Sequence, residues 1–134
     1  MSKSNATESD FLALTFTATA LPWAAVTDLD IHLHTADPGE AGISTTSEAT
    51  YTSYAAVIVS RSASAWTVTG DTATNDNLIQ FPQCTGGSNT ITHVSVCPSG
   101  STQILYSGAL NSPLSVSNGI QPQFAPGALS IQES

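Results

Sequence analysis

Asp28-Leu-Asp-Ile-His-Leu-His-Thr-Ala-Asp-Pro-Gly-Glu-Ala-Gly42 is the stretch of sequence that decides the fold. Its first seven residues alternate polar and apolar side chains, which is the two-residue period of a strand buried on one face. The Asp37-Pro38-Gly39 turn then ends the strand, because Asp bonds its own backbone, Pro fixes φ and Gly permits positive φ. We therefore expect residues 28–35 to form the central strand against which the other strands register.

Short runs rich in β-branched and aromatic residues make up most of the remaining chain, with turn signals between them. From this pattern, strands are predicted at residues 51–60, 66–69, 78–81, 90–96, 103–110 and 128–131. About eight or nine short strands with at most one short N-terminal helix are typical of an all-β fold. The sequence therefore predicts an antiparallel β-sandwich or jelly roll.

The Asn-Gly step near the C-terminus allows a register to be predicted. A three-residue loop with Gly119 in the left-handed conformation pairs Val116 with Ile120. The same register pairs Leu114 with Pro122 and keeps apolar side chains on one face, whereas a two-residue loop would mix apolar and polar side chains. We therefore expect Gly119 to be a structural turn, as Gly39 is.

The N-terminal residues 1–8 are polar, and we expect a mobile arm or one that is ordered only by a partner. The Ser9-Asp10 pair fits the start of a short helix that carries the apolar residues of 11–16, although their alternation fits a strand equally well. Residues 9–134 are then predicted to form a single β-sandwich domain.

The charge balance excludes several classes of function. The chain has two basic and ten acidic residues and a net charge of −8, so it cannot neutralise a run of phosphates in nucleic acid or an anionic membrane. We find neither a signal peptide pattern nor an apolar run of the ~20 residues that span a bilayer. We therefore expect a protein made in the cytoplasm, with no nucleic-acid or membrane partner.

Cys84 and Cys97 are the only cysteines. Without a secretory signal, the sequence favours two free thiols that pack as small apolar side chains. A disulfide stays open as an alternative, because both residues lie near the ends of adjacent predicted strands. A zinc site is disfavoured, since no histidines follow at finger spacing.

One face of the predicted central strand concentrates the residues that could ligate a metal: Asp28, Asp30, His32 and His34. A catalytic metal would need a third ligand from another strand, and His93 and Glu48 are the only candidates. We therefore interpret this face as a solvent face or one side of a subunit contact, with no metal and no cofactor. The sequence contains no Gly-x-Ser-x-Gly elbow and no phosphate-binding loop, so neither motif indicates an enzyme.

Four aromatic residues could form a sugar-stacking platform: Trp23, Tyr51, Tyr54 and Trp66. Trp66 is in phase with Val68, so we expect it in the core. Tyr51 and Tyr54 fall on opposite faces of the predicted strand, which leaves one of them free to be exposed.

The order of the motifs resembles a group of small proteins encoded in tailed-phage genomes. The resemblance extends over about residues 10 to 132 and rests on these segments: Leu33-His-Thr-Ala-Asp-Pro-Gly-Glu-Ala-Gly42, Glu48-Ala-x-Tyr-x-x-Tyr-Ala55, Trp66-x-Val-x-Gly70, Ile79-x-Phe-Pro82, Thr92-His93, Leu105-Tyr-Ser-Gly-Ala-Leu110 and Ser117-Asn-Gly-Ile120. The group is similar to the small all-β cement, or decoration, proteins that bind the outer surface of a phage head. Similar short proteins are labelled tail-fibre proteins.

The resemblance implies a structural virion protein on the outer surface of the bacteriophage capsid, with the major capsid protein as its partner and self-association as a dimer or more. It implies no catalytic residues. The relatives carry an Arg soon after the second Tyr, whereas this chain places its Arg at position 61. We expect the protein–protein interface to involve Ser2, Lys3, Glu40, Glu48, Tyr51, Tyr54 and Arg61. The rival hypotheses are a tail or tail-fibre adhesin that binds a host receptor and a cupin-like metalloenzyme built on His32 and His34.

Overall fold

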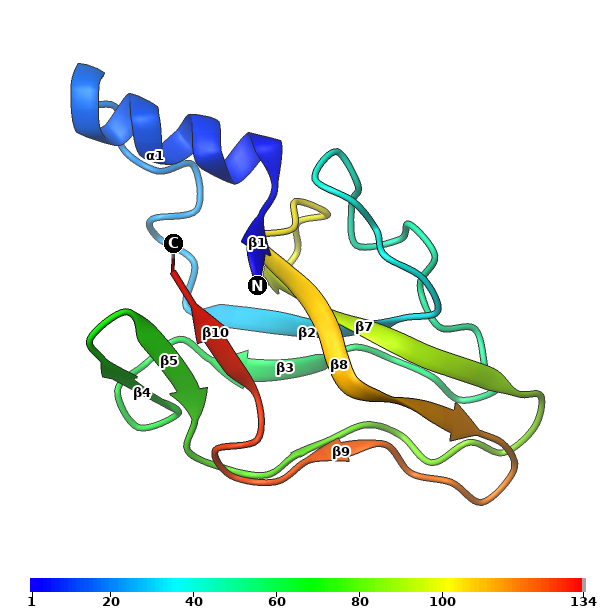
Figure 1. Cartoon of the computed structure of the whole chain (residues 1–134). Helices are drawn as coiled ribbons and strands as arrows, with labels where there is room; N and C mark the ends of the chain where they lie inside the picture. Colours follow the sequence, from blue (N-terminus) through cyan, green and yellow to red (C-terminus); the bar gives the residue numbers. More distant parts are fainter. Residues whose placement is uncertain (134) are drawn as a thin grey trace.

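The computed structural model describes residues 1–133, which form one helix and ten strands (Figure 1). The elements are β1 (Ser2–Lys3), α1 (Asn5–Thr17), β2 (Asp28–His34), β3 (Val57–Ser60), β4 (Trp66–Thr69), β5 (Thr72–Asn75), β6 (Ile79–Gln80), β7 (Asn89–Pro98), β8 (Tyr106–Val116), β9 (Gln123–Phe124) and β10 (Ser130–Gln132). Within this described part of the chain, no helix has the length and apolar character needed to cross a membrane.

The strands form an antiparallel β-sandwich, which confirms the predicted fold class. One layer is a five-stranded sheet in the order β1-β8-β7-β2-β3, and the other contains the β10-β5-β4 sheet and the β6–β9 pair. The core between them takes Ile31 from β2 and Val94 from β7 on one side, and Phe81 and Ile131 on the other. All four of these side chains are at most 8% exposed, so the apolar face of β2 lies in the main core.

β2 is an internal strand of the five-stranded sheet, paired with β3 along one edge and with β7 along the other. The middle position belongs to β7, so the prediction that β2 is the central strand was wrong by one place. The turn that follows β2 is confirmed: Gly39 has φ 75°, and its N–H donates to the Asp37 carboxylate at 2.9 Å. The local pattern therefore determined where the strand runs and where it ends, but not its position in the strand order of the sheet.

The N-terminal residues are not a separate arm, which corrects the prediction for residues 1–8. β1 pairs with β8, and the Ser4 hydroxyl accepts the Thr7 N–H to cap α1 five residues earlier than Ser9. Thr7 is fully buried and donates to the carbonyl of Ile104 at 3.0 Å. Polar composition alone suggested mobility, whereas these polar groups anchor the segment through hydrogen bonds.

The predicted strand at 51–60 is shortened to β3, because Ser53 has φ 81° and residues 51–54 form a turn. β5 was missed, since its sequence Thr-Ala-Thr-Asn has little apolar content. It pairs with β4 across the turn at Gly70, which has φ 62°. Trp66 is half-buried against the core, and its indole N–H donates to the carbonyl of Ser60 at 3.1 Å.

The predicted hairpin register around Gly119 was wrong, although Gly119 is left-handed, with φ 92°. β8 continues to Val116, and its end pairs with the start of β7, so that Val116 lies opposite Asn89. The residues after the turn bond instead to the segment around Cys84, whose N–H donates to the Ile120 carbonyl at 2.8 Å. A long ladder with β7 thus replaced the local hairpin.

β8 extends well beyond the predicted strand at 103–110. Its register with β7 shifts between Ile91 and His93, and the extra residues on β8 include Pro113. A proline is tolerated there because the irregular stretch requires no ladder hydrogen bond from its nitrogen. The two cysteines are both free and buried, as the sequence favoured.

Candidate functional site

The polar face of β2, which concentrates the candidate ligands, is covered rather than exposed to solvent. His34 is fully buried, and Asp30 and His32 are half-buried. The prediction of a solvent face was therefore wrong for these positions. On the neighbouring strand, Ser95 and Cys97 lie opposite His32 and Asp30 and are also buried, so the sheet has a second, polar buried layer.

The cover is provided by the loop after the Gly39 turn, which returns to the free edge of β2. β3 pairs with β2 only as far as Ile31. Beyond that point the Leu33 carbonyl accepts the Ala49 N–H, and the Thr35 N–H donates to the Ser47 carbonyl, each at 2.8 Å. Glu48 stands opposite His34 in this short antiparallel bridge. The loop therefore acts as a replacement strand and carries Glu48 to the polar face.

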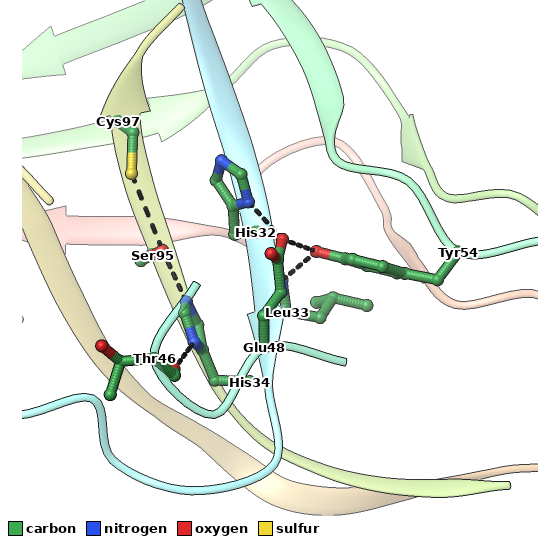
Figure 2. Close-up of polar contacts among 8 residues, drawn as sticks. All are labelled: His32, Leu33, His34, Thr46, Glu48, Tyr54, Ser95 and Cys97. Atoms are coloured by element: carbon green, nitrogen blue, oxygen red, sulfur yellow. Dashed lines mark hydrogen bonds and ion pairs between the residues drawn. The ribbon is translucent and has the colours of Figure 1, made fainter. Parts of the chain in front are cut away.

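Glu48 joins β2 to the turn that precedes β3 (Figure 2). The His32 Nδ1–H donates to Glu48 Oε2 at 2.5 Å, and the Tyr54 hydroxyl donates to the same oxygen at 2.8 Å. The Tyr54 oxygen in turn accepts the N–H of Leu33 at 3.0 Å. Burial raises the pKa of Tyr54 far above its usual value, and the Glu48 hydrogen bond adds to this shift. The tyrosine therefore stays protonated and acts as a donor.

His34 uses both ring nitrogens. Its Nδ1–H donates to the Thr46 carbonyl at 2.8 Å, and its Nε2 accepts the Ser95 hydroxyl at 2.7 Å. Burial lowers the pKa of His34, and the neighbouring His32 lowers it further. The ring is therefore held neutral between the loop and β7.

Cys97 is a poor candidate for a nucleophile. It is fully buried, and burial raises the pKa of its thiol to about 12. Thiol chemistry requires the thiolate and access to it, and both are lacking at this position. Cys84 is also buried and donates to the Gly86 carbonyl at 3.1 Å. Both thiols therefore act as packing groups.

Metal binding requires a ligand set that this face does not assemble. Within residues 1–133, no three His, Cys, Asp or Glu side chains are grouped so that they could hold a metal ion. In the same part of the chain, Asp30 Oδ1 and His32 Nε2 are buried without a hydrogen-bond partner. His93 lies opposite His34 in the β2–β7 ladder, and its Nδ1 pairs with the Thr92 hydroxyl at 2.8 Å. The side chains of His32, Glu48 and Tyr54 instead form a hydrogen-bonded network that connects the covering loop to the edge of β2.

The structure does not gather the seven predicted interface residues on one surface. Glu48 and Tyr54 are brought together, but in the covered network, and Tyr51 is only 3% exposed. Tyr51 packs edge-on against Tyr54 with ring centroids 5.4 Å apart, so neither forms an exposed platform. The prediction that one of the two is exposed was therefore wrong.

The remaining predicted interface residues lie at separate places. Lys3 forms an ion pair with Glu133, and Ser2 lies in β1. The exposed Glu40 accepts the Asn5 N–H through its backbone carbonyl at 2.9 Å. Whether these side chains meet a partner stays a prediction.

Arg61 binds its own chain. Its guanidinium donates to the carbonyls of Trp23, Ala24 and Val26 at 2.9 to 3.1 Å and lies 5.2 Å from the centroid of the Trp23 ring. The side chain therefore holds the connection between α1 and β2 against the end of β3.

Sequence reasoning missed two apolar surfaces. Leu12, Leu14 and Phe16, at the far end of α1, are 59%, 42% and 78% exposed. A groove of about 1010 Å³ runs between the β10-β5-β4 sheet and the end of the main sheet. A sequence signal for the first surface existed, since residues 11–27 contain no charged side chain.

A family model described as "Podophage GP4 fiber I protein gp80" matches residues 2–132, which is nearly the whole chain. The chain belongs to this family. It is therefore a bacteriophage structural protein, and the family is described as a fibre protein rather than an enzyme. The description names a fibre and not a capsid decoration protein, so the expected virion role is supported and the capsid position is not. No curated protein matches the chain.

Proposed function

We propose that this protein is a structural subunit of a podophage fibre. The observation that carries the proposal is the family match over residues 2–132, because a match of that extent includes every strand of the sandwich. This proposal replaces the capsid cement role. It keeps the fibre location of the alternative hypothesis but assigns the protein a structural role instead of receptor binding. The neighbours of the subunit are then other fibre or tail proteins rather than the major capsid protein.

The distribution of aromatic residues favours a structural role over receptor-sugar binding. A sugar-stacking platform needs several exposed rings, but Tyr51 is buried and Tyr54, Trp23 and Trp66 are each half-buried. Phe16 is 78% exposed, but it lies near the end of α1 without a second exposed ring among the described residues. The polar network around Glu48 is also used internally, since its groups bond to each other and to the backbone. These features suit a rigid packing unit better than an adhesin.

The experiment is to locate the chain in the virion. A short epitope inserted after Asn118 would report its position, because Ser117, Asn118 and Gly119 are exposed in a turn. We expect gold-labelled antibody on fibres and loss of fibre density in particles that lack the gene. Label spread over the head, together with reduced heat resistance of heads without the protein, would instead establish the cement role.

A further inference from the structure

The far half of α1 is exposed, whereas its near half is anchored. Thr7 bonds to Ile104, and the carboxylate of Asp10 accepts from the side chains of Gln103 and Trp23 at 2.8 and 3.3 Å. Phe11 still packs edge-on against Trp23, but the end of α1 projects from the body of the sandwich (Figure 1), and Phe16 near that end is 78% exposed.

The apolar side chains of this projecting end surround the helix. Leu12 and Phe16 are four residues apart and lie on one side, while Leu14 is about 200° around the axis from Leu12. A helix that is apolar on all sides is normally buried on all sides. A flat partner surface would cover only one of these sides, so the end of α1 fits a groove better than a plane.

The same chain contains an apolar groove of suitable size. Its volume of about 1010 Å³ is at the upper end of ordinary ligand pockets. Leu29, Leu105 and Ile131 line it together with Trp66, and Val68, which is 73% exposed, also lines it. None of the three apolar side chains at the end of α1 lines the groove of its own chain.

The charges favour a second copy as the occupant. A chain with a net charge of −8 repels its copies, and Asp71 and Glu133 lie among the groove residues, so copies associate there most easily through an uncharged segment. Residues 11–27 carry no charge, so this segment brings no ion of its own into the groove. Of the groove carboxylates, Asp71 accepts from the side chains of Thr72 and Gln132, and Glu133 is ion-paired with Lys3. Arg61 at the groove already bonds to three carbonyl groups of its own chain, so an apolar insertion leaves that cation satisfied.

We propose that copies of this protein associate head to tail, with Leu12 and Phe16 of one copy inserted into the groove of the next. Because the two surfaces differ, the contact is heterologous and builds rings or open filaments rather than closed pairs. Its place within a fibre rests on the proposed function. Two or three side chains bury less area than a stable standard interface, so each contact is weak and gains strength in an array.

The experiment measures the mass of the purified full chain by sedimentation equilibrium over about a hundredfold range of concentration. The wild-type chain is expected to form dimers and larger species at the high end. A variant with Leu12→Ser and Phe16→Ser should associate at least tenfold more weakly, as should Val68→Arg, whose long side chain would occupy the groove. Ile58→Ser is the matched control: it removes an apolar residue that is 65% exposed on β3, outside both surfaces, and should leave association unchanged.

A mixing experiment distinguishes the proposed contact from other modes of association. The helix variant keeps its groove and the Val68→Arg variant keeps its helix, so an equimolar mixture should form pairs of one copy of each and nothing larger. A wild-type chain that stays monomeric throughout would overturn the proposal. So would association that is lost in the helix variant but unaffected by Val68→Arg, since that result indicates helix–helix pairing. These outcomes are independent of the position of the label in the virion.

Discussion

The Tyr54 hydroxyl accepts the N–H of Leu33 at 3.0 Å. Leu33 lies between the part of β2 that pairs with β3 and the part that pairs with the covering loop. β3 pairs as far as Ile31, and the loop at 47–49 begins to bond at the Leu33 carbonyl. A side chain thus satisfies a strand N–H that no backbone carbonyl reaches. Because the same hydroxyl donates to Glu48, it connects the edge of the sheet to the covering loop.

We predict that Tyr54→Phe lowers the free energy of unfolding by about 1–3 kcal/mol, because it leaves the Leu33 N–H and the Glu48 carboxylate each short of a partner. Urea denaturation with and without the substitution measures the change. Tyr106→Phe is the control, since its hydroxyl bonds to the exposed Glu133, and it should cost less than about 1 kcal/mol. Equal losses in the two variants would contradict a special role for Tyr54.

His34 predicts a dependence of stability on pH. Burial lowers its pKa in the folded state below the ordinary value of 6.5, so the unfolded chain binds the proton first as the pH falls. Stability is therefore full above about pH 6.5 and declines below it, until the pH reaches the lowered pKa of the folded state. The slope from one such group is at most about 1.4 kcal/mol per pH unit.

Urea midpoints measured from pH 8 to pH 5 test this dependence. We expect His34→Gln to be less stable at pH 8, because the bonds to Thr46 and Ser95 are weakened, but to have a flatter profile below pH 6.5. His93→Gln is the comparison: it removes one of the charges that lower the pKa of His34, so it should flatten the profile less than His34→Gln does. An unchanged slope in His34→Gln would assign the pH dependence to other groups.

The sequence was sufficient for features that a few adjacent residues determine. The alternation in β2 and the turn at Gly39 depend on local sterics and hydrogen bonds, and both are present. The predicted register after Gly119 was wrong because a local hairpin competes with pairing to any other strand. Here the end of β8 pairs with the start of β7, which is distant in the sequence. Pairing between distant strands is decided by the whole sheet, and no local pattern encodes it.

The candidate site was predictable in its components but not in its assembly. Alternation placed His32 and His34 on one face, and Glu48 was among the few partners considered for them. The covering loop was not foreseen, because it meets β2 mainly through backbone and polar groups rather than through an apolar run. Such loops leave no periodic signal, although they bury a histidine as completely as a strand does.

Gly39→Val should destabilise the fold by more than about 1 kcal/mol. No atom lies within 4 Å of the position that a Cβ would take, so the cost comes from φ 75° and not from a clash. Gly39→Asn is the matched control, since Asn tolerates the left-handed conformation, and it should cost clearly less. Thermal melting of the three proteins compares them, and equal melting temperatures would show that the turn relaxes to negative φ.

We predict that the dialysed protein holds no stoichiometric zinc, iron or manganese, and that EDTA leaves its melting temperature unchanged. Both nitrogens of His34 are already hydrogen-bonded, and the two buried side-chain atoms without partners in residues 1–133, His32 Nε2 and Asp30 Oδ1, are fewer ligands than a metal centre requires. Elemental analysis by mass spectrometry checks the content. Metal that survives dialysis in the wild type, and is lost when both histidines are replaced by Ala, would overturn the prediction.

Arg61→Lys is expected to loosen the connection at residues 18–27 even though it keeps the positive charge. The planar guanidinium bonds to three carbonyls and stacks near the Trp23 ring, a geometry that a single ammonium cannot reproduce. Because the side chain is exposed, the global free energy of unfolding should change by less than about 1 kcal/mol, while local opening increases. Limited chymotrypsin digestion, followed by mass spectrometry, should show cleavage after Trp23 several-fold faster in Arg61→Lys and in Arg61→Ala. If the lysine variant resists cleavage as well as the wild type, charge alone holds the segment and the hydrogen-bond geometry contributes little.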